Sequence, residues 1–229
     1  MKVLIFGATG MVGRGVLREC LLAEDVGLVQ TVGRTATEIQ SGNLREVVHA
    51  DLFDLASIED MLAGFNACFF CLGVSSAGMT EETYTRLTYT LTTTVAETLA
   101  RLNPQMTFIY VLGTGTDSSE QGRSMWGRVK GRTENVLLRM PFRAAYMFRP
   151  GFIVPLHGIR SKTRSYQIFY AVLKPVLPVL HWAFPKSVLT TEEIGQAMLI
   201  VARLEPAKRV METGDIRQLL DASRSRTFC

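Results

Sequence analysis

Three glycines near the amino terminus have a spacing suited to phosphate binding. Gly7, Gly10 and Gly13 follow the apolar run "KVLIF" and precede a segment whose apolar residues have helical spacing. Gly7 permits a tight turn, Gly10 lets backbone N–H groups approach a pyrophosphate, and Gly13 lets the helix pack closely on the strand. The positive end of the helix dipole then faces the phosphates. The sequence therefore predicts a dinucleotide site that includes Gly7, Thr9, Gly10, Met11, Val12 and Gly13.

A second group of polar residues follows the next apolar run, "LVQTV". Here the chain has Arg34 and the hydroxyl of Thr35, with no acidic residue. A carboxylate at this position would accept hydrogen bonds from the adenosine ribose of NAD, whereas a guanidinium attracts the 2′-phosphate of NADP. Arg14, beside the glycine loop, adds positive charge to the same site. We therefore expect NADP in preference to NAD; the alternative is that Arg34 is an ordinary solvated side chain.

Asp51 and Leu52 follow the third apolar run and admit two interpretations. Asp51 can accept a hydrogen bond from the adenine amino group while Leu52 packs on the ring. Equally, Asp51 and Asp54 can be turn or helix-capping residues. The residue types do not separate these two interpretations.

Trp126 and Lys130 are four residues apart on a predicted helix and therefore share a face. The ammonium can reach a ribose, while the indole forms a flat wall or stacks with the ammonium. The indole N–H donates a hydrogen bond but does not ionise near neutral pH. Trp126 therefore cannot serve as a general acid.

Other residues could take part in proton transfer or substrate binding. His157, after "RPGFIVPL", is the best titratable candidate near neutral pH, and Tyr84 and Tyr166 are weaker ones. Thr114 has a hydroxyl that can bind a carbonyl oxygen, although a loop threonine is more often a turn residue. We keep Lys130, Thr114 and His157 as candidate catalytic residues.

The elements that must position these residues alternate between strands and helices. Strand-like runs occur at 2–6, 28–32, 46–50, 67–72, 107–112 and 144–149, with helical patterns from about 11, around 81–102 and around 125–139. This order predicts a doubly wound α/β fold with a parallel sheet, whose carboxyl edge holds the ligand.

The pattern changes after Pro150. We expect a nucleotide-binding domain over 1–150 and a smaller substrate or lid region over 151–229, part of which packs back on the sheet. Thr190 or Thr191 can cap a helix whose first turn contains Glu192 and Glu193.

Composition excludes several classes of protein. The chain has 229 residues, 47% of them hydrophobic, and can bury one sizeable core without disulfides or metal. The net charge is only +4, without a basic run longer than two residues, so no nucleic-acid surface is expected. The four cysteines lie in mainly apolar or terminal contexts, and Met1 leads directly into a strand, so we expect a reducing cytoplasm and no signal peptide. We interpret the C-x-x-C of Cys68 and Cys71 as buried thiols and expect no metal site; zinc binding or redox use is the alternative.

The apolar segment 166–184 contains Lys174, His181, Pro175 and Pro178, so it is too interrupted for a transmembrane span. We expect it to cover a pocket for a small apolar substrate. Contact with a membrane surface, a homodimer interface or an unidentified protein partner are the alternatives.

Several motifs together resemble the short-chain dehydrogenase/reductase superfamily, in its atypical and extended-like branch. They are "GATGMVG", the "ADLFD" after the third strand, the glycine-ended "FFCLG", the W-x-x-x-K segment and "FRPGFIVP". Within that branch the chain is similar to the Tat-interacting-protein-like, NmrA-like and epimerase-like proteins. The resemblance covers roughly residues 1–205 and implies a Rossmann fold that binds NAD(P).

The resemblance also implies roles for individual residues. Lys130 would hold the nicotinamide ribose hydroxyls, and Gly73 would lie beneath that ribose. The segment from Arg149 to Val154, which includes Pro150, Gly151, Phe152 and Ile153, would pass beside the nicotinamide ring.

Active members of the superfamily use a tyrosine as proton donor and a serine that binds the substrate oxygen. Here Trp126 stands at the tyrosine position, and Leu112 and Gly113 stand where the serine is expected. We therefore expect an NADP-dependent oxidoreductase with a non-standard proton donor, acting on a small apolar carbonyl or alcohol. One alternative is a regulatory or redox-sensing protein that binds NAD(P) without catalysis. Another is an epimerase or dehydratase, which would usually need the same tyrosine.

Overall fold

The structure, a computed structural model, describes residues 1–159 and 188–227 of the chain. Its centre is a seven-stranded sheet in the order β3-β2-β1-β4-β5-β6-β9, and all neighbouring strands in it are parallel. A second small sheet pairs β7 with β8. The strands are β1 (Lys2–Phe6), β2 (Leu28–Gly33), β3 (Leu44–Val48), β4 (Ala67–Phe70), β5 (Thr107–Val111), β6 (Ala144–Arg149), β7 (Phe152–Val154), β8 (Val188–Thr190) and β9 (Val210–Glu212).

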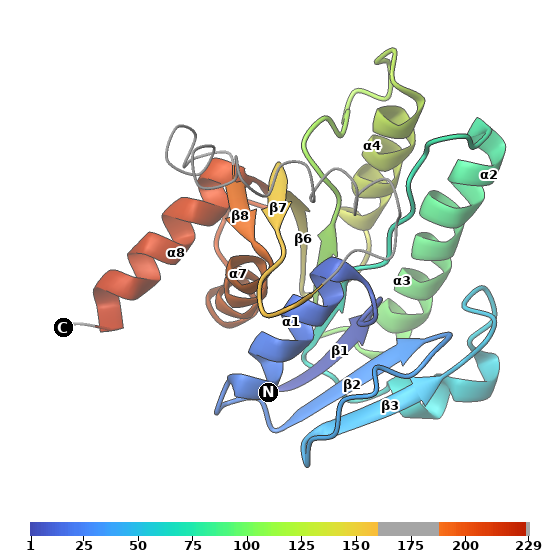
Figure 1. The fold of residues 1–229 in the computed structure, drawn as a ribbon. Coiled ribbons are helices and arrows are strands. Elements are labelled where there is room, and N and C mark those ends of the chain that lie inside the picture. The colour runs from blue at the N-terminus through green and yellow to red at the C-terminus, as the bar shows by residue number, and fades with distance from the viewer. Residues whose placement is uncertain (160–187, 228–229) are drawn as a thin grey trace.

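Helices cover both faces of the main sheet (Figure 1). One face packs on α1, α7 and α8, and the other packs on the 3-10 helix η1, α3 and α4. The π-helical turn η2 joins α2 to α3, so the predicted long helix over 81–102 is confirmed. The helices are α1 (Met11–Leu22), η1 (Ala56–Leu62), α2 (Glu81–Thr85), η2 (Arg86–Thr90), α3 (Leu91–Leu102), α4 (Met125–Leu137), α7 (Thr191–Leu204) and α8 (Thr213–Thr227).

Strand β1, near the middle of the sheet, is apolar on both faces because helices cover both faces there. In β1, Val3 and Ile5 belong to the core beneath α1 and α7, and Leu4 and Phe6 belong to the core beneath α3 and α4. A parallel sheet covered by helices on both sides needs this continuous apolar pattern. The predicted doubly wound α/β fold is confirmed, with strand and helix ends that differ from the expected ones by about two residues.

Helix α7 returns the chain to the first half of the fold and lies against α1. Its amino-terminal capping box is formed by Thr190 and Glu193, so the predicted cap is confirmed. Glycines allow the close approach: a Cβ on Gly15 would lie 2.6 Å from Thr191 Cβ, and one on Gly195 would lie 2.7 Å from Glu19 Cγ. The described part of the second half therefore shares its core with the first half, through α7 on α1 and β9 beside β6.

The division near residue 150 stays a prediction, because much of the expected lid is outside the described residues. The apolar segment 166–184 and Tyr166 also lie outside them. Among the helices that the structure does describe, none is both long and apolar enough to cross a membrane.

The contact between α1 and α7 leads to a prediction about stability. Replacing Gly15 by Ala should lower the free energy of unfolding by roughly 1–3 kcal/mol, because the methyl group overlaps Thr191. This loss should occur although alanine favours an isolated helix over glycine by about 1 kcal/mol. Urea denaturation of the two proteins measures the difference.

Gly214 in α8 offers a matched control, because a Cβ there meets nothing within 4 Å. Gly214→Ala should leave stability unchanged or raise it slightly. Equal effects of the two substitutions would contradict the proposed close packing of α1 on α7.

Candidate functional site

Loops from five strands meet at the carboxyl edge of the main sheet. In the strand register, Phe6 aligns with Val32 on one side and with Phe70 on the other, and β5 and β6 continue the alignment. The loops after these strands therefore begin at nearly the same level. They contain the predicted site residues Gly7, Arg34, Gly73, Thr114 and Pro150.

The glycine loop after β1 is packed too closely for side chains. Gly7 has a φ of +84°, and a Cβ on it would lie 2.8 Å from the backbone of Cys71 and Leu72 at the end of β4. A Cβ on Gly13 would lie 2.1 Å from the carbonyl oxygen of Gly7. The N–H of Gly10 donates to that same oxygen at 2.9 Å. The turn and the close helix contact expected from the glycine spacing are thus present.

Helix α1 begins directly after this loop. Its N-cap is Gly10, so no side chain caps the first N–H groups, and its first turn contains no acidic residue. Such an amino terminus offers backbone donors and the positive end of the helix dipole to an anion. Thr9, Met11 and Val12 are half-buried around it.

Two arginines near this loop have no anionic partner in the part of the chain that the structure describes. Arg34 and Thr35 are exposed just beyond the end of β2, and Arg14 is half-buried in α1. Within residues 1–159 and 188–225, neither guanidinium takes part in a hydrogen bond or ion pair. Both charges therefore remain available to a ligand phosphate.

In the loop after β3, the acidic side chains form hydrogen bonds typical of turn residues. Asp51 accepts a hydrogen bond from the N–H of Phe53 at 2.9 Å, and Asp54 accepts one from Ala56 at 3.0 Å. Leu52 is only 5% exposed and belongs to the core beneath η1 and α3. An adenine contact by Asp51 or Leu52 stays a prediction.

Lys130 reaches from α4 to the end of β5. Its Nζ donates to the carbonyl oxygen of Leu112 at 2.9 Å and lies 5.7 Å from the centroid of the Trp126 ring. Among the described residues no carboxylate forms an ion pair with it. Burial lowers the pKa of Lys130 from its ordinary 10.5 to about 8. Gly113, at the expected serine position, has no side chain that would cover the Nζ of Lys130.

Trp126 packs beneath the loop that follows β5. A Cβ on Gly115, which has a φ of +92°, would lie 2.6 Å from Cη2 of the indole. The same loop touches α4 at two further glycines: a Cβ on Gly127 would lie 2.8 Å from Gly115 O, and one on Gly131 would lie 1.7 Å from Asp117 O. The indole therefore helps to seat this loop on α4, next to Lys130.

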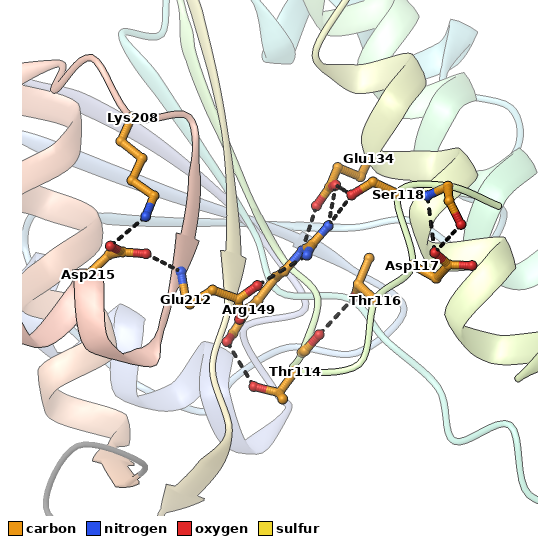
Figure 2. A network of polar contacts seen from close by, with 11 residues as sticks. Thr114, Thr116, Asp117, Ser118, Glu134, Arg149, Lys208, Glu212 and Asp215 are labelled. Atoms are coloured by element: carbon orange, nitrogen blue, oxygen red, sulfur yellow. Dashed lines mark hydrogen bonds and ion pairs between the residues drawn. The ribbon is translucent and has the colours of Figure 1, made fainter. Parts of the chain in front are cut away.

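A buried ion pair lies one helical turn further along α4 (Figure 2). Arg149, the last residue of β6, donates from Nε to Glu134 Oε2 at 3.0 Å and from Nη2 to Glu134 Oε1. It also donates from Nη1 to Glu212 Oε1 at 3.1 Å and from Nη2 to the hydroxyl of Ser118. Its carbonyl oxygen accepts the hydroxyl of Thr114 at 3.2 Å. The Thr114 hydroxyl is thus engaged by the protein backbone.

The "RPGFIV" segment turns away from the main sheet after Pro150, which is buried. The N–H of Gly151 donates to Thr213 Oγ1 at 2.8 Å. Phe152 and Ile153 then enter β7, and Phe152 is 51% exposed. The structure thus places the start of this segment beside Thr114, at the edge that also holds Lys130.

His157 lies in a different environment from Lys130. Its Nε2 is 2.8 Å from Glu192 Oε2 on α7, and this hydrogen bond lowers the pKa of Glu192. Arg18 of α1 lies 3.8 Å from the same carboxylate. In the described part of the chain, His157 has no contact with Lys130 or Trp126, so its role as proton donor stays a prediction without geometric support.

Some residues at this edge were not expected from sequence. Glu134, Ser118 and Glu212 complete the network of Arg149, and Gly115, Gly127 and Gly131 allow the loop to touch α4. The two helical glycines four residues apart were a usable signal for such a contact. The acidic partner of Arg149 had no comparable signal, because 15 residues separate the two in sequence.

The cysteines and acidic residues indicate no further chemistry here. Cys20, Cys68 and Cys71 are free thiols, and burial raises the pKa of Cys71 to about 12. In the part of the chain that the structure describes, no three His, Cys, Asp or Glu side chains are grouped to hold a metal ion.

Two kinds of relatives resemble the chain. Protein FMP52-2, mitochondrial, of Scheffersomyces stipitis is 26% identical over 197 residues, covering 85% of this chain and 82% of the relative. Protein fmp52-1, mitochondrial, of Aspergillus terreus is 28% identical over 169 residues, covering 71% and 70%. Among solved structures, MoeE5 in complex with UDP-glucuronic acid and NAD has a TM-score of 0.69 at 18% identity, covering 93% of this chain and 76% of MoeE5. Uronate dehydrogenase from Agrobacterium tumefaciens has a TM-score of 0.65 at 15% identity, with coverage of 93% and 76%.

The structural likenesses establish the fold, and the family follows from sequence. The model described as the NAD dependent epimerase/dehydratase family matches residues 3–126, which is more than half of the chain. That match runs from β1 through the glycine loop and β5 to the start of α4. The resemblance to the short-chain dehydrogenase/reductase superfamily is thereby confirmed, and the chain belongs to the NAD(P)-binding NAD-dependent epimerase/dehydratase family.

Proposed function

We propose that this protein binds NADP(H) at the carboxyl edge of its sheet and is an oxidoreductase acting on a small carbonyl or alcohol. The observation that supports the cofactor most directly is the combination of an uncapped α1 with Arg34 at the next strand end, which has no partner among the described residues. The first suits a pyrophosphate and the second suits a further phosphate on the adenosine ribose.

The charges at the end of β2 favour NADP over NAD. The ribose of NAD is commonly held by an acidic residue, and a carboxylate would repel the extra phosphate of NADP. This position has Arg34 instead, and Thr35 adds a hydroxyl beside it. Arg14, on the first turns of α1, contributes a second positive charge near the same loop.

Among the described residues, Lys130 is the best-placed proton donor. A nicotinamide cofactor supplies or accepts the hydride, so the protein must supply the proton to the substrate oxygen. The ammonium has three donors and uses one for the carbonyl oxygen of Leu112, which leaves two for ribose and substrate oxygens. A pKa of about 8 lies close to neutral pH, where a general acid works best. We therefore assign to Lys130 both the ribose contact and the proton transfer.

The alternative is an NAD(P)-binding regulatory protein without catalysis. The engagement of Trp126 and Thr114 favours it, because the indole lies under Gly115 and the threonine hydroxyl donates to Arg149. Neither side chain then replaces the tyrosine or serine of active relatives. The substrate class itself rests on segment 166–184, which is outside the described residues.

Two cellular compartments are candidates for the location of this protein. Cysteine usage led us to expect the cytoplasm, whereas the two fungal relatives are named as mitochondrial proteins. Fractionation of cells that produce the full-length chain separates these expectations.

Arg34→Ala should reduce the preference for NADPH. Loss of a charge-assisted contact to the 2′-phosphate is worth about 1.5–3 kcal/mol, or roughly 10- to 100-fold in the dissociation constant of NADPH. The affinity for NADH should change little. Fluorescence titration of both cofactors measures the effect.

Arg45→Ala is the matched control, because Arg45 is exposed on β3 and also lacks a partner among the described residues. It should leave both affinities unchanged. If the unaltered protein binds NADPH and NADH equally, Arg34 does not select the cofactor.

Carbonyl reduction with NADPH should slow as the pH rises through about 8. The pKa of Lys130 is depressed, so its ammonium is present below about pH 8 and is lost above it, and only the ammonium can donate a proton. Lys130→Met should lower the rate by roughly 100-fold or more. NADPH consumption across a panel of carbonyl compounds, recorded from pH 6 to 9.5, measures both effects.

His157→Ala is the control for this assignment and should retain the wild-type rate. A pH-independent rate, or an active Lys130→Met, would show that Lys130 is not the acid. If NADPH binds but no compound is reduced until Trp126→Tyr is introduced, the regulatory alternative is favoured.

A further inference from the structure

The buried ion pair between Arg149 and Glu134 is close to Lys130 through the geometry of α4. Glu134 follows Lys130 by four residues, so the two side chains project from the same face of the helix, one turn apart. Lys130 points to the end of β5 and Glu134 to the end of β6. The inner face of α4 is therefore attached to two neighbouring strands at their carboxyl ends.

The Arg149–Glu134 ion pair, which joins α4 to β6, is buried and has a fixed orientation. The Glu134 side chain is 1% exposed and the Arg149 side chain is 12% exposed. Two nitrogens of the guanidinium donate to the two carboxylate oxygens, and the hydroxyl of Ser118 donates to Glu134 at 2.8 Å. Planar two-point pairing of this kind fixes orientation, which a single bond to a lysine does not.

The backbone at Arg149 and Pro150 also contacts the loop that follows β5. The cofactor ribose is proposed to lie between this backbone and the Lys130 ammonium. The carbonyl oxygens of Arg149 and Pro150 accept the hydroxyl and the N–H of Thr114, at 3.2 and 3.0 Å. Leu112, which anchors the Lys130 ammonium, donates its N–H to Phe148 at 2.8 Å. A change in the spacing of α4 and β6 would therefore move the ammonium relative to the backbone at Pro150.

Within the described ranges 1–159 and 188–227, Lys130 has no anionic partner that would hold it in place by itself. Among the described residues, its ammonium contacts a neutral carbonyl oxygen and an aromatic face. The nearby loop is seated on α4 by backbone contacts at Gly127 and Gly131, which are not charged either. The location of the ammonium thus depends on how α4 is docked.

We propose that Glu134 and Arg149 are positioning residues that fix the Lys130 ammonium relative to the Pro150–Gly151 backbone, with Ser118 as the bridge between them. This inference rests on the proposed function in one respect, namely that the cofactor ribose lies between the Lys130 ammonium and the Pro150–Gly151 backbone. The docking of Lys130 itself does not depend on the cofactor.

Three substitutions test the network in the full chain. Arg149→Lys keeps the charge and loses the two-point pairing. Glu134→Gln removes the charge at nearly constant shape. Ser118→Ala removes only the bridging hydroxyl of an exposed loop residue, so it should fold even where the other two do not. Asp25→Asn, in the exposed pair with Arg203 between the α1–β2 loop and α7, is the matched control.

Two measurements separate positioning from simple stabilisation. The first is the pKa of Lys130, from NMR of lysine-labelled protein with the signal assigned by Lys130→Arg. The second is the dissociation constant of NADPH. Both are taken well below the thermal midpoint of each variant, so that all the proteins compared are folded.

We expect the pKa of Lys130 to rise from about 8 toward 10.5 in Arg149→Lys and Glu134→Gln, and less in Ser118→Ala, as water reaches the ammonium. Removing the Glu134 charge would by itself lower that pKa, so a rise in Glu134→Gln reports exposure. NADPH should bind roughly tenfold more weakly, because small displacements in a site have large effects. Asp25→Asn should match the wild type in both measurements.

The inference is overturned if the folded variants lose thermal stability but keep the wild-type pKa of Lys130 and the wild-type affinity for NADPH. A wild-type protein that does not bind NADPH would refute the proposed function instead. In that case the pKa of Lys130 in Ser118→Ala and Arg149→Lys still decides whether the network positions the ammonium.

Discussion

At several glycines, main-chain segments approach so closely that no side chain would fit between them. This fold and its candidate site depend on that constraint. The glycine loop touches the end of β4 at Gly7 and the start of α1 at Gly13, and α1 touches α7 at Gly15. Two more contacts of this kind seat the loop after β5 on α4, at Gly127 and Gly131. A methyl group at any of these places would overlap main-chain or Cβ atoms, and well-packed interiors cannot relax far enough to admit it. The same contacts bring the helix ends and strand ends of the site to one edge.

The charged side chains at this edge differ in the partners that they contact, and this difference indicates two kinds of role. Arg149 and Glu134 satisfy one another in a buried, two-point pair, and such a pair is costly to break because one charge is left buried alone. Among the described residues, the half-buried Lys130 contacts only neutral groups, and burial lowers the pKa of its ammonium. Arg34 is exposed and unpaired within the described residues. The first arrangement is typical of structural support, and the other two are typical of groups that meet a ligand.

The chain keeps the family's nucleotide-binding framework and differs from its active members at the proton-transfer positions. The framework depends on main-chain geometry at Gly7 and Gly13, where a side chain would overlap backbone atoms. The proton-transfer step depends on individual side chains, and the resemblance to the superfamily implies that Trp126 stands where active members have a tyrosine and Gly113 where they have a serine. The indole has acquired a packing role beneath Gly115. Loss of the usual acid therefore does not imply loss of the nucleotide site.

The order of residue types was sufficient to predict the architecture, because strand and helix periodicities and the glycine spacing are local properties. The strands from β1 to β6, the capping box at Thr190 and Glu193, and the turn at Gly7 all follow from residues within a few positions of one another. The contacts of individual side chains did not follow, because their partners are distant in sequence. The segment that begins at Arg149 was expected to pass beside a nicotinamide ring, and this stays a prediction. Nothing in the sequence indicated that the Arg149 side chain pairs with Glu134, or that His157 lies against Glu192 of α7. The depressed pKa of Lys130 is likewise a consequence of burial between α4 and β5, which exists only once those elements have packed together.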